Sequence, residues 1–268
     1  PQYPCITSPG KAYNAITVGN LRTKSGAYTS LSPIYSMSSS SSYDELSHIA
    51  NKPDISAPGS SIAYVSSGTT ITFMSGTSCA APLITGIVAQ LHQARVLTKT
   101  NPTRTKATLL LGASNADIST TNNTVHGNYW FRDRSGAGLA NAPKTIDAAL
   151  DYTYNTYSIN LNTVEDGKEY ISSSKYLDVG DTIRVVMAFD KAEDGSIPSN
   201  GYVTDIDLRI LDANGNIKAS SISSYNNVEI IEYTATIAGD YKICVRVHDH
   251  IEATSAVYLK VATAWYIE

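Results

Sequence analysis

The chain has 268 residues, of which 42% are hydrophobic and 16% charged, and its formal net charge is -4. This apolar content is enough for one or two packed domains, and the weakly negative charge argues against a nucleic-acid-binding surface. Ser, Thr, Asn and Tyr take the place of charged residues, as is common in extracellular proteins, so we expect a secreted or cell-surface location. The sequence contains no run of about 18 apolar residues, so no membrane span is expected.

The cysteine count and the first residue of the chain give two further expectations. Three cysteines, Cys5, Cys79 and Cys244, do not make a disulfide framework. Cys79 and Cys244 lie in apolar runs, and we expect them to be buried thiols. The chain begins with Pro1 and not with Met, so we expect a processed or truncated piece of a longer protein.

The first 75 residues predict short strands joined by polar loops. An apolar strand is expected over 13–18, ending at Gly19-Asn20. The serine run 38–42 cannot build a core and predicts an exposed, mobile loop. Residues 61–65 and 70–73 flank Ser66-Ser67-Gly68, a pattern that favours a β-hairpin.

A serine at a strand-to-helix turn is the main candidate for chemistry. Ser78 follows Gly76, which permits a tight turn, and Pro82 falls in the first turn of the helix predicted over 77–97. Free backbone N–H groups and the positive end of the helix dipole can stabilise an oxyanion formed beside the hydroxyl. The simpler alternative is that Ser78 is only an N-cap. Because apolar residues cover most of this helix, we expect it to be buried, with Gly86 at a close backbone contact.

Two further helices are expected before the character of the chain changes. Asn101-Pro102-Thr103 predicts the start of one that stops at Gly112, and residues 146–150 predict a short last one. Beyond Asp151, period-2 runs separated by turns predict an antiparallel β-sandwich or jelly roll of about 115 residues. Its strands are expected over 158–161, 168–171, 182–189, 205–211, 217–220, 228–236, 239–247 and 256–262.

Several motifs resemble those of one enzyme family. Gly-Thr-Ser-Cys-Ala-Ala-Pro at 76–82 resembles Gly-Thr-Ser-x-Ala-x-Pro, the nucleophile motif of subtilisin-like serine proteases. Ala-Ile-Thr-Val-Gly at 15–19 and Lys-Pro-Asp-Ile-Ser-Ala-Pro-Gly at 52–59 are similar to two other segments of that family. The glycine-rich segment 136–142 resembles the part that closes subtilase catalytic domains.

The second half is similar to the β-sandwich appended to some bacterial subtilases. The shared motifs are Asp-Ile-Asp-Leu at 205–208, Asn-Gly at 214–215, Asn-Asn-Val-Glu at 226–229 and Ala-Gly-Asp-Tyr at 238–241. The resemblance therefore implies two parts. Residues 1–152 would be the C-terminal portion of an α/β, parallel-sheet catalytic domain, and residues 153–268 an all-β sandwich or jelly-roll module.

The resemblance implies a serine endopeptidase that cleaves polypeptides through an acyl-enzyme on Ser78, with no cofactor required for the chemistry. Asp54 is not expected to be the triad acid, because that acid precedes both the histidine and the serine in this family. The triad His and Asp are expected outside this chain, which makes the upstream half of the catalytic domain, as a separate chain, a candidate partner. The histidines present are not expected to be catalytic: His48, His92, His126, His248 and His250.

Three alternatives stay open at this point. Subtilases often bind structural calcium, and Asp190, Asp194, Asp205 and Asp207 offer oxygen ligands, although turn-forming, solvated acids would look the same. The chain could instead be a non-catalytic pseudoprotease or binding module, since it holds no triad His and Asp. A glycan-binding role of the tyrosines in the second half competes with ordinary strand packing; these are Tyr202, Tyr225, Tyr233 and Tyr241.

Overall fold

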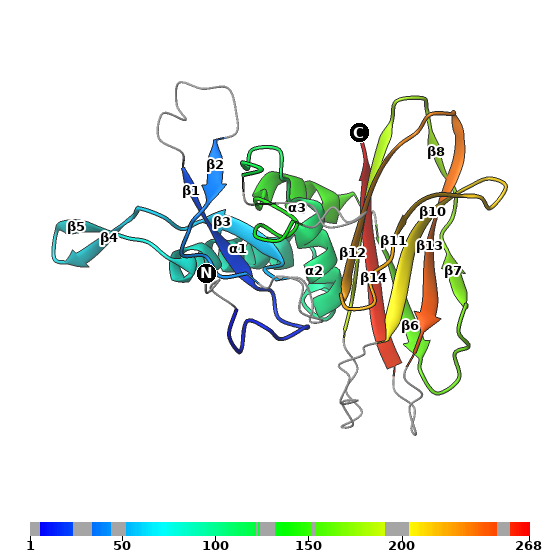
Figure 1. Cartoon of the computed structure of the whole chain (residues 1–268), viewed down its shortest axis with the longest axis horizontal. Helices are drawn as coiled ribbons and strands as arrows, with labels where there is room; N and C mark the ends of the chain where they lie inside the picture. The colour runs from blue at the N-terminus through cyan, green and yellow to red at the C-terminus, as the bar shows by residue number, and fades with distance from the viewer. Residues whose placement is uncertain are drawn as a thin grey trace.

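The computed structural model describes residues 6–23, 34–43, 52–121, 123, 132–151, 154–190, 204–250 and 258–268. The described chain is mostly β-sheet, and its few helices lie in the first half (Figure 1). Helices occupy the middle of the molecule, between a small mixed sheet and two antiparallel sheets (Figure 1). Cys79 and Cys244 are buried free thiols, as predicted, and Cys5 lies outside the described residues.

The small sheet has the order β2-β1-β3. Strand β1 (Val18–Thr23) pairs antiparallel with β2 (Tyr35–Met37) and parallel with β3 (Ile55–Pro58). The strand expected over 13–18 therefore starts at the last of those residues, because the register with β3 begins at Val18 and the residues before it form turns.

The serine run that follows β2 is only partly the exposed loop that its composition predicts, because Ser39 and Ser40 are exposed. Ser38 and Ser41 are buried. The Oγ atom of Ser41 accepts a hydrogen bond from the backbone N–H of Asn20 at 2.9 Å. Ser38 and Ser41 both form a hydrogen bond with the backbone of Asn20 within β1, which composition alone cannot indicate.

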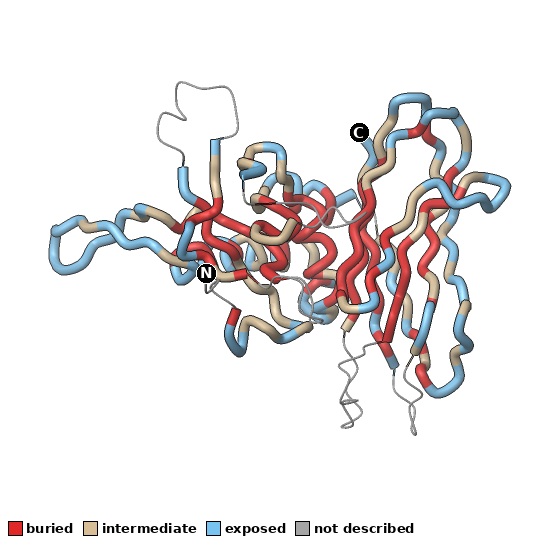
Figure 2. The backbone as a smooth tube through the Cα atoms, in the orientation of Figure 1, coloured by how far each residue is buried: buried red, intermediate tan, exposed pale blue. Residues whose placement is uncertain are grey.

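The predicted hairpin is present as β4 (Ile62–Ser67) and β5 (Thr70–Met74), an antiparallel pair. It projects away from the body of the molecule (Figure 1). Its residues are almost all exposed along the whole length of the two strands (Figure 2).

The helices are α1 (Thr77–Ala94), α2 (Pro102–Leu111) and α3 (Ala142–Leu150), with a short 3₁₀ turn over Val96–Thr98. The side chains of Asn101 and Asn141 accept hydrogen bonds from the first turns of α2 and α3, and each helix has a proline at its start. Helix α2 is buried over most of its length.

Helix α1 is buried on one face only, which corrects the expectation of a fully buried helix. Its buried residues are Cys79, Ala80, Ile84 and Leu91. Gly86 is exposed, and a Cβ placed on it would meet nothing within 4 Å. The apolar character around this helix therefore has no covering layer in the described chain.

Two antiparallel sheets make up the second half. One has the order β12-β9-β14-β6, and the other β11-β10-β13-β7 with β8 also on β13. Residues of both sheets share one apolar core. The strands are β6 (Tyr154–Asn160), β7 (Glu169–Ile171), β8 (Lys175–Leu177), β9 (Thr182–Phe189), β10 (Asp205–Asp212), β11 (Ile217–Ser221), β12 (Val228–Thr234), β13 (Gly239–Asp249) and β14 (Tyr258–Ile267). All but β8 are expected from the period-2 pattern.

Helix α2 joins the two halves of the chain. It packs against β14 and β9, and its leucines belong to one apolar cluster with Val186, Ala188, Ala262 and Ala264 of those strands. A polar contact lies beside this packing, since the side-chain amide of Asn227 donates to the carbonyl of Tyr13 at 3.0 Å.

A buried charge cluster ties α2 to the start of β3. The carboxylate of Asp54 lies 2.7 Å from the Lys52 ammonium and 2.8 Å from that of Lys106, and all three side chains are at most 5% exposed. Burial lowers the pKa of Lys52 to about 8. The negative charge of Asp54 opposes this decrease, and the positive charge of Lys106 adds to it. Burial alone would raise the pKa of Asp54, but Lys106 and Lys52 outweigh it and hold that pKa below its usual value.

Two glycines fix the point where α1 starts. The backbone N–H of Gly76 donates to the carbonyl of Gly59 at 2.8 Å, and a Cβ on Gly59 would lie only 2.6 Å from the Gly76 oxygen. Gly76 has a φ of 155° just before the helix, a conformation that other residues rarely adopt. The sequence can therefore make this turn only with small residues at both positions.

We predict that Asp54→Asn lowers the free energy of unfolding by roughly 3–5 kcal/mol near pH 7, because it leaves two buried ammonium groups without a carboxylate. Lys52→Met should cost less, since the Lys106–Asp54 pair remains. Urea titrations of the two variants beside the wild type give these values. Equal stability of Asp54→Asn and the wild type would show that the cluster does not hold the fold.

The pH dependence of the same cluster gives a second readout. Because the folded pKa of Lys52 is about 8 and its ordinary value is 10.5, the unfolded chain binds more protons between these pH values. Stability from this group should therefore rise as the pH increases from 8 to 10.5. Urea titrations at several pH values should show this rise in the wild type and not in Lys52→Met. The comparison distinguishes the contribution of Lys52 from that of other titrating groups.

The two glycines at either side of Ser78 should respond in opposite directions. Gly76→Ala places a side chain at a positive φ and should destabilise the chain by about 1–3 kcal/mol. Gly86→Ala adds a methyl group to an exposed helix interior with open space around it, and should stabilise the chain by up to about 1 kcal/mol. Thermal unfolding of both variants tests this. Loss of stability in Gly86→Ala would mean that this face is covered after all.

Candidate active site

Ser78 is the second residue of α1 and is exposed to solvent. The N-cap position belongs to Gly76, and no side chain caps the helix. The simpler alternative, that Ser78 is itself the N-cap, therefore does not hold. Its hydroxyl makes no hydrogen bond within the part of the chain that the structure describes.

The first turn of α1 leaves backbone donors free beside this hydroxyl. The N–H groups of Cys79 and Ala80 donate to the Gly76 carbonyl at 3.0 and 3.4 Å. Over the described ranges, the N–H groups of Thr77 and Ser78 have no acceptor, and the first turn has no acidic side chain. Two free donors at the positive end of an 18-residue helix can stabilise a developing oxyanion.

No described histidine reaches Ser78. His92 lies near the other end of α1 from Ser78, and its Nε2 atom is 3.2 Å from the hydroxyl of Thr105 on α2. The two others are in the second half, where His248 contacts Arg246 at 3.0 Å and His250 contacts Asp166 at 2.7 Å. His48 and His126 lie outside the described residues. The described geometry thus places an exposed hydroxyl beside free N–H donors, with no described histidine near it.

Asp54 is engaged in the buried lysine cluster, so it is not available to orient a histidine. One of its oxygens also accepts the backbone N–H of Thr17 at 2.7 Å. This agrees with the expectation that the segment 52–59 is structural. Lys106 is the partner that sequence reasoning missed, since nothing in the pattern of α2 indicates an ion pair with a residue so far along the chain.

A buried amide lies near the turn before α1. Asn20 is fully buried, and its Oδ1 accepts the hydroxyl of Ser60 at 3.3 Å. The same oxygen would be 2.7 Å from a Cβ on Gly59. Asn20 therefore supports the loop that carries the Gly59 carbonyl, a role that the sequence analysis missed.

The aspartates expected to bind calcium are not brought together as a set. Asp207 is paired with Arg209 at 2.9 Å and Arg246 at 3.4 Å. Asp205 lies two residues earlier on β10, whereas Asp190 follows β9. Among residues with described positions, no three His, Cys, Asp or Glu side chains are grouped so as to hold a metal ion. The calcium assignment stays a prediction, and Asp194 lies outside the described residues.

Burial dominates the titration of these acids. It raises the pKa of Asp205, and the negative charges of Asp207 and Asp249 add to the rise against the opposing effect of His248. Burial also raises the pKa of Asp190, and Lys106 opposes it. Glu229 is buried close to Asp205 and Asp207. Burial raises its pKa well above the ordinary value, although Ser221 donates a hydrogen bond to one of its oxygens.

The tyrosines of the second half fit strand packing. Tyr233 and Tyr241 pack as a tilted ring pair with centroids 5.5 Å apart, and the Tyr241 hydroxyl donates to the carbonyl of Ile237 at 2.7 Å. Tyr241 is 3% exposed. Tyr202 lies outside the described residues. Over the described residues, no helix is both long and apolar enough to cross a membrane.

Comparisons with known proteins identify proteases that resemble part of this chain. The chain is 30% identical over 178 residues to the PII-type proteinase of Lacticaseibacillus paracasei, covering 63% of this chain and 9% of that protein. It is 37% identical over 113 residues to the subtilisin-like protease SBT3.16 of Arabidopsis thaliana, covering 41% of this chain and 15% of that one. The chain thus spans a small part of the length of these relatives.

A solved structure, the prenylagaramide maturation protease PagA, matches with a TM-score of 0.38 and 20% identity, covering 54% of this chain and 46% of that one. The family comparison is more specific. Residues 4–137, half of the chain, match the model of the subtilase family. The matched residues contain Ser78, Gly76 and the segment 52–59. The chain therefore belongs to the subtilase family.

Proposed function

We propose that this chain is part of a subtilisin-like serine endopeptidase that hydrolyses peptide bonds through Ser78. Residues 1–152 would be the C-terminal portion of its α/β catalytic domain and residues 153–268 an appended β-sandwich, with the enzyme secreted or at the cell surface. The observation that carries the proposal is the exposed Ser78 hydroxyl beside free N–H groups of α1, inside a family-matched nucleophile motif.

The proposed reaction uses these groups in order. The Ser78 Oγ attacks the carbonyl carbon of the scissile peptide while a base takes its proton. The negative charge moves to the carbonyl oxygen, where the N–H of Ser78 and the helix dipole stabilise it. The C–N bond then breaks, the amine leaves with a proton, and water later hydrolyses the ester on Ser78.

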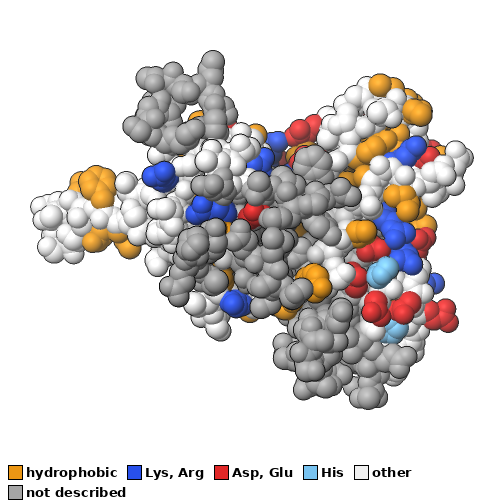
Figure 3. Space-filling view, viewed as in Figure 1, with side chains coloured by type: hydrophobic (Ala, Val, Ile, Leu, Met, Phe, Trp, Pro, Cys, Tyr) orange, Lys and Arg blue, Asp and Glu red, His pale blue; other side chains and the backbone are white. Residues whose placement is uncertain are grey.

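The base and its orienting acid would come from a complementary segment of the catalytic domain. Apolar side chains without cover support this part of the proposal, since large exposed apolar patches mark interaction surfaces. They lie on the β4–β5 hairpin and on the outer face of α1, next to Ser78 in the sequence. The set is Tyr64, Val65, Ile71, Phe73, Met74 and Leu83, each between 43% and 67% exposed. Hydrophobic side chains are visible on both sides of the hairpin (Figure 3).

A fluorophosphonate probe tests the role of Ser78. We expect labelling of Ser78 in material that contains the complementary segment, and little or none on this chain alone, because no base would activate the hydroxyl. Ser78→Ala should abolish labelling and lower peptide hydrolysis by roughly 10⁶-fold. The matched control is Ser39→Ala, which changes another exposed serine and should label normally.

Labelling of Ser78→Ala at the wild-type level would overturn the assignment of the nucleophile. Assembled material that carries a triad histidine but neither labels nor cleaves peptides would favour the alternative, a non-catalytic binding module. The specific observation behind that alternative is that no described histidine reaches Ser78.

The hairpin can be tested separately from the chemistry. Burial of one phenylalanine side chain contributes about 1.5–3 kcal/mol, so Phe73→Ser should weaken binding of the complementary segment by roughly tenfold or more. Native mass spectrometry or sedimentation of the co-expressed pieces measures this. Val179→Ser, at a residue that is 66% exposed in the second half, is the control. Equal weakening by both variants, or by neither, would contradict docking on the hairpin.

A further inference from the structure

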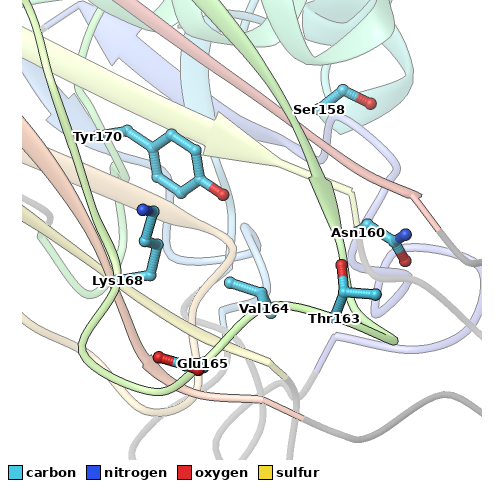
Figure 4. Close-up of a pocket in the computed structure, with 7 residues that line it drawn as sticks. All are labelled: Ser158, Asn160, Thr163, Val164, Glu165, Lys168 and Tyr170. Carbon is cyan, nitrogen blue, oxygen red and sulfur yellow. The ribbon is translucent and has the colours of Figure 1, made fainter.

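A cavity of about 440 Å³ opens at the edge of the second half, away from Ser78. It lies between β6 and β7, which are edge strands of the two antiparallel sheets. Residues of the loop that connects these strands form part of its wall. Its lining residues are Ser158, Asn160, Thr163, Val164, Glu165, Lys168 and Tyr170 (Figure 4). Cavities of about 300–1,000 Å³ are typical of sites for small ligands.

The connecting loop is held at both ends by backbone hydrogen bonds, so the cavity is already formed. The N–H groups of Thr163 and Val164 donate to the Asn160 carbonyl at 3.2 and 3.0 Å. At the other end, Gly167 donates to the carbonyl of Val247 at 2.7 Å, and Val247 donates back to Lys168 at 2.9 Å. A ligand would therefore meet walls that do not have to be ordered on binding.

Several polar groups of the lining are free to bind a ligand. In the described chain, the side-chain polar ends of Thr163, Glu165, Lys168 and Tyr170 have no hydrogen-bond or ion-pair partner. The Oδ1 of Asn160 accepts the Asn162 N–H at 3.1 Å, which leaves its NH₂ group free. The lining thus offers hydroxyl, amide and ammonium donors together with a carboxylate acceptor.

Two of the lining residues are apolar or aromatic. Val164 and Tyr170 pack against the core that the two sheets share, and the Tyr170 ring lies against Tyr157 with centroids 5.5 Å apart. In Figure 4 the Tyr170 hydroxyl points toward the space between Lys168 and the side of Ser158 and Thr163. One surface therefore combines a ring with polar groups around its rim.

We propose that this cavity binds a neutral saccharide unit. Glu165 and Lys168 cancel in charge, so neither an anion nor a cation is favoured overall. The apolar surface of Val164 and Tyr170 suits the C–H face of a pyranose ring. The surrounding donors and the carboxylate match sugar hydroxyls, each of which both donates and accepts. The site is independent of Ser78 and of the proposed protease activity.

The experiment uses the full chain on an array of immobilised neutral oligosaccharides, with immobilised peptides on the same surface. We expect retention on at least one class of glycan and none above background on peptides. Titration calorimetry with the retained oligosaccharide should then show at least tenfold weaker binding for Tyr170→Ala and for Lys168→Ala. Lys168 is exposed, so its variant should keep the fold even where the tyrosine variant does not.

Matched controls are Tyr176→Ala and Lys99→Ala, which change exposed residues outside the cavity and should bind as the wild type does. Absence of retention on every glycan would overturn the proposal. So would retention on peptides alone, or glycan binding that Lys168→Ala leaves unchanged.

Discussion

The carboxylate of Asp54, held between two buried ammonium groups, is the contact on which the first half of the chain depends. Lys52 and Lys106 reach it from the segment before β3 and from α2, and both also donate to the carbonyl of Ala15. Removing one cation leaves a neutral pair, whereas removing the anion leaves two buried like charges. Strand β3 begins directly after Asp54, and the Gly59 carbonyl beyond its end holds the N–H of Gly76. The position of Ser78 therefore follows from this cluster through a single strand.

The same cluster links the two halves of the chain. The Tyr13 carbonyl accepts both the Lys106 ammonium and the Asn227 amide, each at 3.0 Å. Asn227 lies just before β12, and the leucines of α2 share an apolar cluster with β9 and β14. Apolar packing supplies most of the stabilisation here, and the polar contacts fix the orientation. A change in α2 should therefore be felt by both halves at once.

Helix ends, tight turns and strands could be predicted from the sequence, because each depends on neighbouring residues. The Asn-Pro start and Gly stop of α2 and the glycine turn before α1 are confirmed. The period-2 strands of the second half are confirmed as well, with shifted ends for β6 and β14. The start of β1 and the pairing of Lys106 with Asp54 depend on partners distant in the sequence, so no local pattern shows them. The apolar composition of α1 predicts a buried helix, but one face is exposed. Composition shows what a helix can bury and does not show which element covers it. Which residues line the cavity beside β6 was equally out of reach, because two different sheets bring them together.

The exposure of α1 and the isolation of Ser78 can have the same cause. A nucleophilic serine needs a base within hydrogen-bond reach, and an apolar hairpin needs a cover. In the described chain both needs are unmet on adjacent segments, since β5 leads into α1 across only Ser75 and Gly76. A single complementary surface that buries the hairpin would then also bring a base to Ser78. On the proposed mechanism, hydrolysis would be coupled to assembly, and the unassembled chain would carry a helix dipole and oxyanion donors without a nucleophile strong enough to use them.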